Sequence, residues 1–305
     1  MSKISTAINL IKSNKGAFFA NTVKNFLPFL PDRVYLQLLY RFKVGRKLNL
    51  NQPKSFTEKL QWLKLYDRNP HYTSLVDKVA VKSFVAKEIG SQYVIPIIKT
   101  WDDLNDFELA SMPDSFVLKT TNGSGGDGVY ICPDKNQFCF DKASSILNKS
   151  IKSNVYRNLR EWPYKNIVPR FFAEQYLEDD SGALRDYKVM CFNGVPKLIQ
   201  VHMGRYDGVH TQDFYSTEWE RLDLNQKNCV VSNNPTECPH CLEEMLRLSK
   251  ALSTGIPHVR VDWYVVNDRL YFGEFTFFDA SGFDEFIPMD KEYEIGGWID
   301  LSSIE

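Results

Sequence analysis

Several features of common protein classes are missing from this sequence. No run of about 18 apolar residues occurs, which excludes a membrane-spanning helix. The N-terminus lacks a continuous apolar segment and a small-residue cleavage site, so we expect no secretion. Six cysteines among 305 residues are too few for a disulfide scaffold and favour reduced cytoplasmic thiols. Internal repeats, low-complexity tracts and long linkers are also absent. These observations predict an ordinary globular chain of about two domains.

Metal-binding cysteine patterns are nearly absent as well. The stretch Cys238-Pro239-His240-Cys241 is the only candidate, and Cys229 is its only neighbouring cysteine. A structural zinc site usually needs two pairs of ligands. We therefore expect neither a zinc site nor a redox function here.

Acidic residues are scarce at the N-terminal end. Residues 1–50 contain nine Lys and Arg and a single acid, Asp32, so this segment carries +8 in a chain whose net charge is −1. Aromatic and leucine side chains are interspersed with these charges. One interpretation is a helical cap that docks on the main body, and the other is peripheral contact with an anionic membrane at its inner face. No nucleic-acid motif accompanies the charge, so we expect no nucleic acid partner.

Helix and strand signals alternate along the chain. Ser55 and Glu58 fit a capping box before a helix through Tyr66. Asn193-Gly194 is a strong hairpin signal, and Asn267-Asp268 is another. The pattern predicts an α+β chain with mostly antiparallel sheets. We expect helices at 3–13, 17–29, 33–46, 75–89, 103–109, 141–152 and 240–253, an edge strand at 93–98, a strand at 170–177, and hairpins at 116–131, 187–201, 211–224 and 259–275.

Residues 116–131 form the most informative stretch. Two apolar, β-prone segments flank a loop with four glycines in six residues, and Lys119 ends the first segment. Such a loop can direct several backbone N–H groups at a phosphate. The alternative is a hairpin with a flexible Gly/Ser turn. No Gly-Lys-Ser/Thr follows, which excludes a P-loop, and no helix follows, which excludes a dinucleotide fingerprint.

The last predicted hairpin places polar residues on one face. Alternation puts Arg260 beside Asp262 on one strand and Glu274 beside Thr276 on its partner. Two carboxylates and a hydroxyl next to a phosphate loop suit Mg²⁺, and Arg260 could stabilise charge on a transferred phosphoryl group. The alternative is a solvated sheet face with a cross-strand ion pair.

Two further segments carry candidate polar groups. Residues 172–180 end in acids, and a carboxylate just past a strand can bind ribose hydroxyls. After the central hairpin, Arg205 could hold a substrate carboxylate and His202 could assist proton removal from an amine. Lys188, in the hairpin itself, could reach a γ-phosphate. The alternatives are a solvated turn and a surface loop.

Taken in order, these pieces resemble the ATP-grasp superfamily. The resemblance implies two nucleotide lysines, Lys78 and Lys119, and ATP and Mg²⁺ as cofactors. It assigns the metal to Asp262, Glu274 and Thr276, although the superfamily usually has Asn where Thr276 stands. It implies a phosphate-covering loop at Asn122, Gly123, Ser124, Gly125 and Gly126, an adenine hinge at Glu174, Gln175, Tyr176 and Leu177, a ribose carboxylate at Glu178 or Asp180, and a catalytic arginine at Arg260.

A closer resemblance is to the TupA-like branch, found in bacterial surface-polysaccharide gene clusters. It runs from about Pro53 to Pro288, through the phrases at residues 55–64, 116–126, 160–167, 186–194 and 272–276. It implies two α+β subdomains that clamp ATP, after a helical N-terminal extension. The expected divisions are an extension at 1–52, a helical linker and first segment at 53–114, a small subdomain at 115–177 and a C-terminal subdomain at 178–305.

The implied activity is an ATP-dependent carboxylate–amine ligase. ATP would phosphorylate a carboxylate, such as a uronic acid on a glycan precursor or an amino acid, and an amine would displace the phosphate. The expected partners are therefore a small or glycan-linked carboxylate and an amine. A glycosyltransferase of the same pathway is the first alternative, and a nucleotide-binding protein without turnover is the second.

Overall fold

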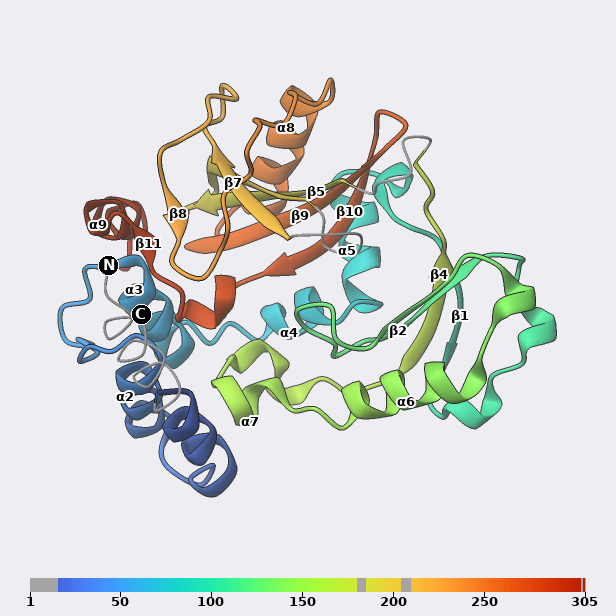
Figure 1. Ribbon diagram of the computed structural model, residues 1–305, viewed down its shortest axis with the longest axis horizontal. Coiled ribbons are helices and arrows are strands. Elements are labelled where there is room, and N and C mark those ends of the chain that lie inside the picture. The colour runs from blue at the N-terminus through green and yellow to red at the C-terminus, as the bar shows by residue number, and fades with distance from the viewer. Residues whose placement is uncertain (1–15, 180–184, 204–209, 303, 305) are drawn as a thin grey trace, which may run out of the picture.

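The computed structural model of the protein describes residues 16–179, 185–203, 210–302 and 304, and two antiparallel sheets dominate it (Figure 1). The smaller sheet has the order β1-β4-β2-β3 and the larger β10-β9-β5-β6-β7; β8 and β11 form a separate pair. The strands are β1 Ile97–Trp101, β2 Phe116–Thr120, β3 Val129–Cys132, β4 Phe171–Gln175, β5 Arg185–Phe192, β6 Val195–Met203, β7 Thr211–Tyr215, β8 Asn225–Gln226, β9 His258–Val266, β10 Arg269–Thr276 and β11 Phe286–Ile287.

The smaller sheet presents the glycine loop. Strands β2 and β3 pair with Lys119 opposite Val129, so the predicted hairpin is confirmed. Helix α6, Phe140–Ile151, runs along this sheet and buries Leu147 against Phe116 and Leu118 (Figure 1). The predicted edge strand at 93–98 does lie at the edge, but it begins only at Ile97. Pro96 has no N–H to donate to a ladder, and the strand starts directly after it.

The larger sheet is built from two hairpins with tight turns. Asn193 and Gly194 take φ values of 50° and 76°, and Asn267 and Asp268 take 47° and 60°, the left-handed conformations that a two-residue type I′ turn requires. One face of this sheet packs on helix α8, Leu242–Leu252. There Trp263 is buried and donates its indole N–H to Ser249 Oγ at 2.8 Å. The opposite face is left to carry polar side chains.

The helical prediction at 75–89 is wrong in one respect that matters for function. Asp77 interrupts it, because its Oδ1 accepts hydrogen bonds from the backbone N–H groups of Val79 and Ala80, both at 2.8 Å. This arrangement is an N-terminal cap, and it opens a turn at Lys78. Helices α4 and α5, on either side of the turn, lie between the two sheets (Figure 1). The helices are α2 Asp32–Lys43, α3 Phe56–Tyr66, α4 His71–Val76, α5 Ala80–Glu88, α7 Val155–Leu159 and α9 Met289–Gly297, besides α6 and α8.

Other element boundaries differ less from prediction. The capping box at Ser55 and Glu58 is confirmed. The helix expected at 103–109 is instead two 3₁₀ turns, Leu104–Asp106 and Leu109–Ser111. The Asp103 side chain caps the start of the first turn by accepting a hydrogen bond from the Asn105 N–H at 2.9 Å. The helix predicted at 33–46 is α2, and it ends at Lys43 rather than at residue 46. Residues 156–169 contain most of α7 and a 3₁₀ turn at Trp162–Asn166.

The N-terminal extension has a small core of its own. Residues 16–26 are helical, and together with α2 they bury Ala20, Val23 and Tyr35 in a cluster that also includes Phe283 of the main body. Arg46 attaches the extension to the body by ion pairs with Glu285 at 2.7 Å and Glu58 at 3.3 Å. The helix predicted at 3–13 lies outside the described residues. No helix in the described part of the chain is both long and apolar enough to cross a membrane.

Candidate functional site

A row of polar residues crosses the open face of the larger sheet. Gln200, Lys188, Asp262 and Glu274 lie directly opposite one another on β6, β5, β9 and β10. Residues that are paired in this way across antiparallel strands point to the same face. A bulge at Gly273 adjusts the register of β10 so that Glu274 faces Asp262. The sheet therefore assembles two predicted metal carboxylates and a lysine from three separate strands.

Asp262 is held by two cations. Arg260 donates to both of its oxygens, from Nε at 2.7 Å and from Nη2 at 2.8 Å. Lys188 Nζ lies 2.8 Å from Oδ2 and also pairs with Asp186 at 2.6 Å. Thr276, two residues after Glu274, accepts a bond from Arg260 Nη2 at 3.1 Å. The predicted cross-strand grouping of these side chains is thus present, with Asp262 buried and Glu274 half-buried.

Asp279 is a member of this cluster that the sequence did not indicate. Its carboxylate forms an ion pair with Arg260 Nη1 and accepts a hydrogen bond from Gln226 Nε2. Burial acts to lower the pKa of Arg260. The carboxylates of Asp262 and Asp279 outweigh burial and raise this pKa above its ordinary value. The guanidinium is therefore a permanent cation with a fixed orientation. No local pattern marks Asp279, because only tertiary contacts bring it to Arg260.

Lys78 reaches the same face from the turn between α4 and α5. Its ammonium forms an ion pair with Glu274, and its backbone N–H donates to Thr121 O at 3.2 Å, where the glycine loop begins. Burial acts to raise the pKa of Glu274, but the Lys78 ammonium outweighs it and lowers the pKa below the ordinary value. Lys78 therefore connects the two sheets at the candidate site.

A second ion-pair group lies on the smaller sheet. The buried Glu174 carboxylate is bonded to Lys119 through one oxygen and to Lys82 Nζ, at 2.9 Å, through the other. Burial acts to raise the pKa of Glu174, but the two ammonium groups lower it below its usual value. Lys82 was missed by the sequence reasoning. Its spacing of four residues from Lys78, one helical turn, was the available signal.

The glycine loop is shaped by contacts with α6. Gly125 and Gly126 take φ values of 65° and 89° and have open space around them, whereas a side chain at Gly123 would collide with the carbonyl of Asp127. The Asn122 side chain donates to Ser150 O at 3.3 Å and to Ser153 O at 3.2 Å. Asn122 therefore anchors the loop by its side chain, which leaves backbone groups to face a ligand.

The remaining predicted nucleotide residues follow β4. Gln175 ends this strand and its backbone N–H donates to Pro96 O at 3.0 Å. Tyr176 and Leu177 are half-buried and Glu178 is exposed. Asp180 lies outside the described residues. The structure thus places residues 175–178 after the strand that carries Glu174, and their roles toward adenine and ribose stay predictions.

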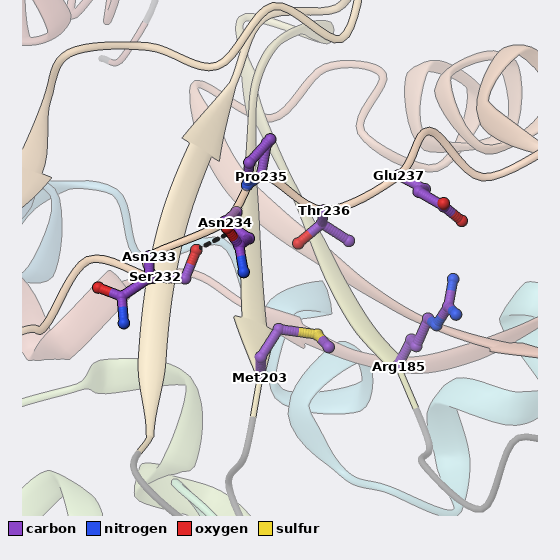
Figure 2. A pocket seen from close by; sticks show the side chains of 8 residues that line it. All are labelled: Arg185, Met203, Ser232, Asn233, Asn234, Pro235, Thr236 and Glu237. Carbon is purple, nitrogen blue, oxygen red and sulfur yellow. Dashed lines mark hydrogen bonds between the residues drawn. The ribbon is translucent and has the colours of Figure 1, made fainter.

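The predicted acceptor patch is only partly described. His202 on β6 is paired with Asp186 on β5. Its Nδ1 atom lies 2.7 Å from Nε2 of His210. Arg205 lies outside the described residues. Beside the patch is a groove of about 370 Å³, lined by Arg185, Met203 and residues 232–237. Figure 2 shows Arg185 extending toward Glu237, while Met203 lies below Asn234 and Thr236.

A buried polar group joins three segments next to Glu274. Lys64 of α3 donates to the carbonyls of Leu159 at 2.9 Å and Ser281 at 2.8 Å, and Glu161 accepts a bond from the Ser281 hydroxyl. Burial lowers the pKa of Lys64 to about 7, although Glu161 opposes the shift. Burial also raises the pKa of Glu161. These contacts hold the left-handed turn at Ala280 and Ser281, whose φ values are 44° and 54°.

The carboxylates fit a hard divalent cation as a partial ligand set. Asp262 and Glu274 supply oxygen donors from adjacent strands, and the Thr276 hydroxyl follows Glu274 on the same face. Within the described residues, no three His, Cys, Asp or Glu side chains are grouped to hold a metal by themselves. Mg²⁺ typically takes only one or two protein carboxylates and completes its shell with water and phosphates. The donor set is therefore suited to a cation that arrives with a nucleotide.

Comparison with known proteins identifies the family. The family model described as TupA-like ATPgrasp matches residues 58–300, which confirms the resemblance that the sequence indicated. No curated protein sequence matches the chain. D-alanine-D-alanine ligase from Helicobacter pylori aligns over 80% of this chain and 69% of its own, at 14% identity and a TM-score of 0.44. The ATP complex of the Bacillus anthracis ligase aligns over 73% and 60%, at 15% identity and a TM-score of 0.40.

A third structural neighbour belongs to a different enzyme. N5-carboxyaminoimidazole synthase from Aspergillus clavatus aligns over 67% of this chain and 44% of its own, at 12% identity and a TM-score of 0.37. The chain therefore spans less than two thirds of the length of the second and third of these proteins.

Proposed function

This chain belongs to the TupA-like ATP-grasp family, and we propose that it is an ATP-dependent ligase that joins a carboxylate to an amine. The observation that carries the proposal is a set of four cations, Lys78, Lys119, Lys188 and Arg260, on three strands of the two sheets and on the turn at Lys78 that connects these sheets beside the glycine loop. A polyphosphate with several negative charges is the ligand that such a group suits.

The residues divide into phosphate ligands and metal ligands. Lys78 and Lys119 would hold the phosphates from the two sheets, with backbone N–H groups of residues 123–126 above them. Asp262 and Glu274 would hold Mg²⁺, with Thr276 as a weaker ligand or through water. ATP supplies the phosphoryl group, and Mg²⁺ neutralises charge on its phosphates. Arg260 and Lys188 remain on the same face, where they would stabilise charge on the transferred group.

The chemistry has two displacement steps. A carboxylate oxygen of the first substrate attacks the γ-phosphorus, and ADP leaves with the electrons of the broken P–O bond. An amine nitrogen then attacks the acyl carbon, inorganic phosphate leaves, and the amine gives up a proton. We assign His202 to that proton and Arg205 to the substrate carboxylate, because a planar guanidinium matches a carboxylate through two hydrogen bonds.

The substrate class follows from the family resemblance. A uronic acid of a surface-polysaccharide precursor, or an amino acid, would supply the carboxylate. The activity requires ATP, which places the reaction in the cytoplasm and, for a lipid-linked precursor, at the inner face of the membrane. The proposal keeps the four divisions of the chain that the sequence predicts.

A screen for ADP release tests the proposed function. The full-length protein is supplied with Mg-ATP, a panel of uronic acids and amino acids, and a panel of amines, and products are identified by mass spectrometry. We expect one ADP and one phosphate for each new amide. A new glycosidic bond formed without ATP would identify a glycosyltransferase instead. Tight nucleotide binding without any turnover across the panel would indicate a binding protein.

A further inference from the structure

The predicted phosphate ligands and the predicted metal ligands are bonded to one another. Lys78 forms an ion pair with Glu274, and Lys188 and Arg260 bond to Asp262. A phosphate group can take Lys78 only if the lysine leaves Glu274. The Glu274 side chain is 29% exposed, so water only partly replaces this partner, and a half-buried carboxylate that loses its cation is destabilised. The ion pair between Lys78 and Glu274 therefore opposes nucleotide binding when no metal is present.

The second nucleotide lysine lies in a different arrangement. Lys119 is also bonded to a buried carboxylate, Glu174, but that carboxylate keeps a second cation in Lys82, at 2.9 Å. Lys82 is itself fixed by donating to Ile95 O at 2.7 Å. Lys119 can therefore move to a phosphate while Glu174 stays compensated. The two lysines therefore differ. When Lys119 moves, Lys82 still compensates Glu174, but when Lys78 moves, another cation has to take its place at Glu274.

We infer that the ion pair between Lys78 and Glu274 is a switch that makes nucleotide binding depend on the divalent cation. This inference rests on the proposed nucleotide site. Coordination of the cation by Glu274 compensates the carboxylate and repels the Lys78 ammonium, which is then available to a phosphate. Metal and nucleotide consequently raise each other's affinity through this chain's own residues, in addition to their direct attraction.

The switch predicts that one substitution raises the affinity for nucleotide without metal and lowers it with metal. Glu274→Gln removes the charge that retains Lys78, so in EDTA the variant should bind the non-hydrolysable analogue AMP-PNP about tenfold more tightly than the parent, since a charged hydrogen bond no longer has to be broken. In excess MgCl₂ the same variant should bind it more weakly than the parent, because a metal ligand is lost. Isothermal titration calorimetry measures both affinities.

Two further variants separate the ion pair from simple loss of charge. The gain in EDTA should vanish when Glu274→Gln is combined with Lys78→Met, because the double-mutant cycle isolates the pair. Glu88→Gln, an exposed position at the end of α5, changes net charge equally and should leave the affinity unchanged. Thermal unfolding confirms that each variant is folded.

The outcomes of this experiment are distinct. A gain that persists without Lys78 would overturn the inference, as would Glu274→Gln binding no more tightly than the parent in EDTA. Binding of Mg-AMP-PNP by the parent would in either case leave the proposed function intact. Failure of the parent to bind the analogue with Mg²⁺ would reject the proposed function together with the switch.

A separate observation concerns the surface of the N-terminal extension. The helix at residues 16–26 buries Ala20 and Val23 in its core, but it leaves Phe18 and Phe26 67% and 71% exposed. Phe29, just beyond it, is 76% exposed. Phenylalanine is normally among the most buried residue types. Three such side chains within twelve residues form an apolar surface that is expensive to leave in water.

The charge around these rings identifies the kind of partner. Residues 16–50 contain six Lys and Arg, of which Arg46 is taken up by ion pairs with Glu58 and Glu285 of the main body. The one acid, Asp32, is already bonded to Arg160 at 3.0 Å and to Arg68 at 2.9 Å. The surface therefore combines exposed aromatic rings with an excess of positive charge. Insertion of the rings below the headgroups and attraction of the cations to anionic lipid act together. We propose that Phe18, Phe26 and Phe29 dock this protein on an anionic membrane.

Vesicle sedimentation of the full-length protein tests this docking. It should pellet with vesicles of equal parts phosphatidylglycerol and phosphatidylcholine, and not with phosphatidylcholine alone. Binding should weaken as salt is raised, because the Debye length falls. The triple substitution Phe18→Ser, Phe26→Ser and Phe29→Ser should abolish binding. Val168→Ser, at a position 75% exposed on the main body, is the matched control and should have no effect.

Two results would overturn the lipid assignment. Equal binding of the parent and the triple variant would place the lipid contact elsewhere. No vesicle binding, together with a parent that is dimeric and a triple variant that is monomeric by light scattering, would make the surface an interface between two copies. Circular dichroism establishes that the triple variant is folded, because the changed side chains are exposed.

Discussion

Basic residues serve in two opposite ways in this protein. In the candidate site, Lys78, Lys82, Lys119 and Lys188 each bond to a carboxylate that the fold buries or half-buries. In the extension, Arg41 and Lys47 are exposed, and within the described residues neither pairs with a carboxylate. A buried cation needs a compensating charge before the protein folds stably, whereas a surface cation is compensated by water and salt.

This difference determines what each region can bind. A ligand of the site has to exchange partners with ion pairs that already exist, so binding is selective for groups that replace both members of a pair. A ligand of the extension meets cations that give up only hydration. We therefore expect stoichiometric, metal-dependent binding at the site and salt-sensitive binding to extended anionic surfaces at the extension.

The largest expected effect is on turnover. Glu274→Gln keeps the shape of the side chain and removes its charge, so ADP formation should fall by roughly a thousandfold, as when a preorganised charge is lost from an active site. The coupled assay for ADP measures this loss. Glu294→Gln, an exposed carboxylate on α9, should leave the rate unchanged. Retained magnesium-dependent turnover in Glu274→Gln would move the metal site elsewhere.

Removal of a paired lysine should weaken nucleotide binding without unfolding the protein. Lys119→Ala leaves Glu174 bonded to Lys82, so the fold should persist. Affinity for Mg-ATP should fall about tenfold to a hundredfold, the range for a lost charged hydrogen bond. Calorimetry measures the affinity, and Lys99→Ala on the exposed edge strand β1 is the control. Equal affinity of Lys119→Ala and the parent would exclude the assigned role.

Lys64 sharpens the comparison, because it is a buried cation bonded to carbonyls. Burial lowers its pKa to about 7, so between pH 7 and 10 the unfolded chain binds more protons at this position than the native state. Stability should therefore rise with pH in the parent, by up to about 1.4 kcal/mol per pH unit from this residue. Lys64→Met should lack that part of the rise.

Denaturant unfolding at pH 7 and pH 9 measures the two slopes. Glu161 and Lys43, the charged groups that act on Lys64, are unchanged in the variant. Identical pH dependence in the parent and Lys64→Met would show that Lys64 keeps its proton across this range.

The smallest effect is expected at an exposed cation of the extension. Arg41→Ala should change the free energy of unfolding by less than about 0.5 kcal/mol, which is typical of a surface substitution. Binding to anionic vesicles should weaken by on the order of 1 kcal/mol, the contribution of one basic residue near a membrane surface. A loss of stability as large as that of a core substitution would remove the contrast between the two regions.

Much of the local structure could be predicted from the sequence. The Ser55 capping box and the turns at Asn193-Gly194 and Asn267-Asp268 were correct, because their residues satisfy backbone requirements within a few positions. The shared face of Asp262 and Glu274 was also predicted, since strand alternation and a short hairpin determine it. The break at Asp77 was missed, because the apolar spacing continues through it and only its side-chain cap ends the pattern.

The sequence by itself determined the turns, the alternation of the strands and the family, because each depends on residues that are close along the chain or on phrases in a set order. Only the tertiary structure decided which charges meet. Lys78 and Glu274 are 196 residues apart, and Lys82 and Glu174 are 92 apart. Whether a lysine faces water, a carboxylate or a carbonyl depends on how two sheets and their helices pack, and that choice determines its charge and its ligand.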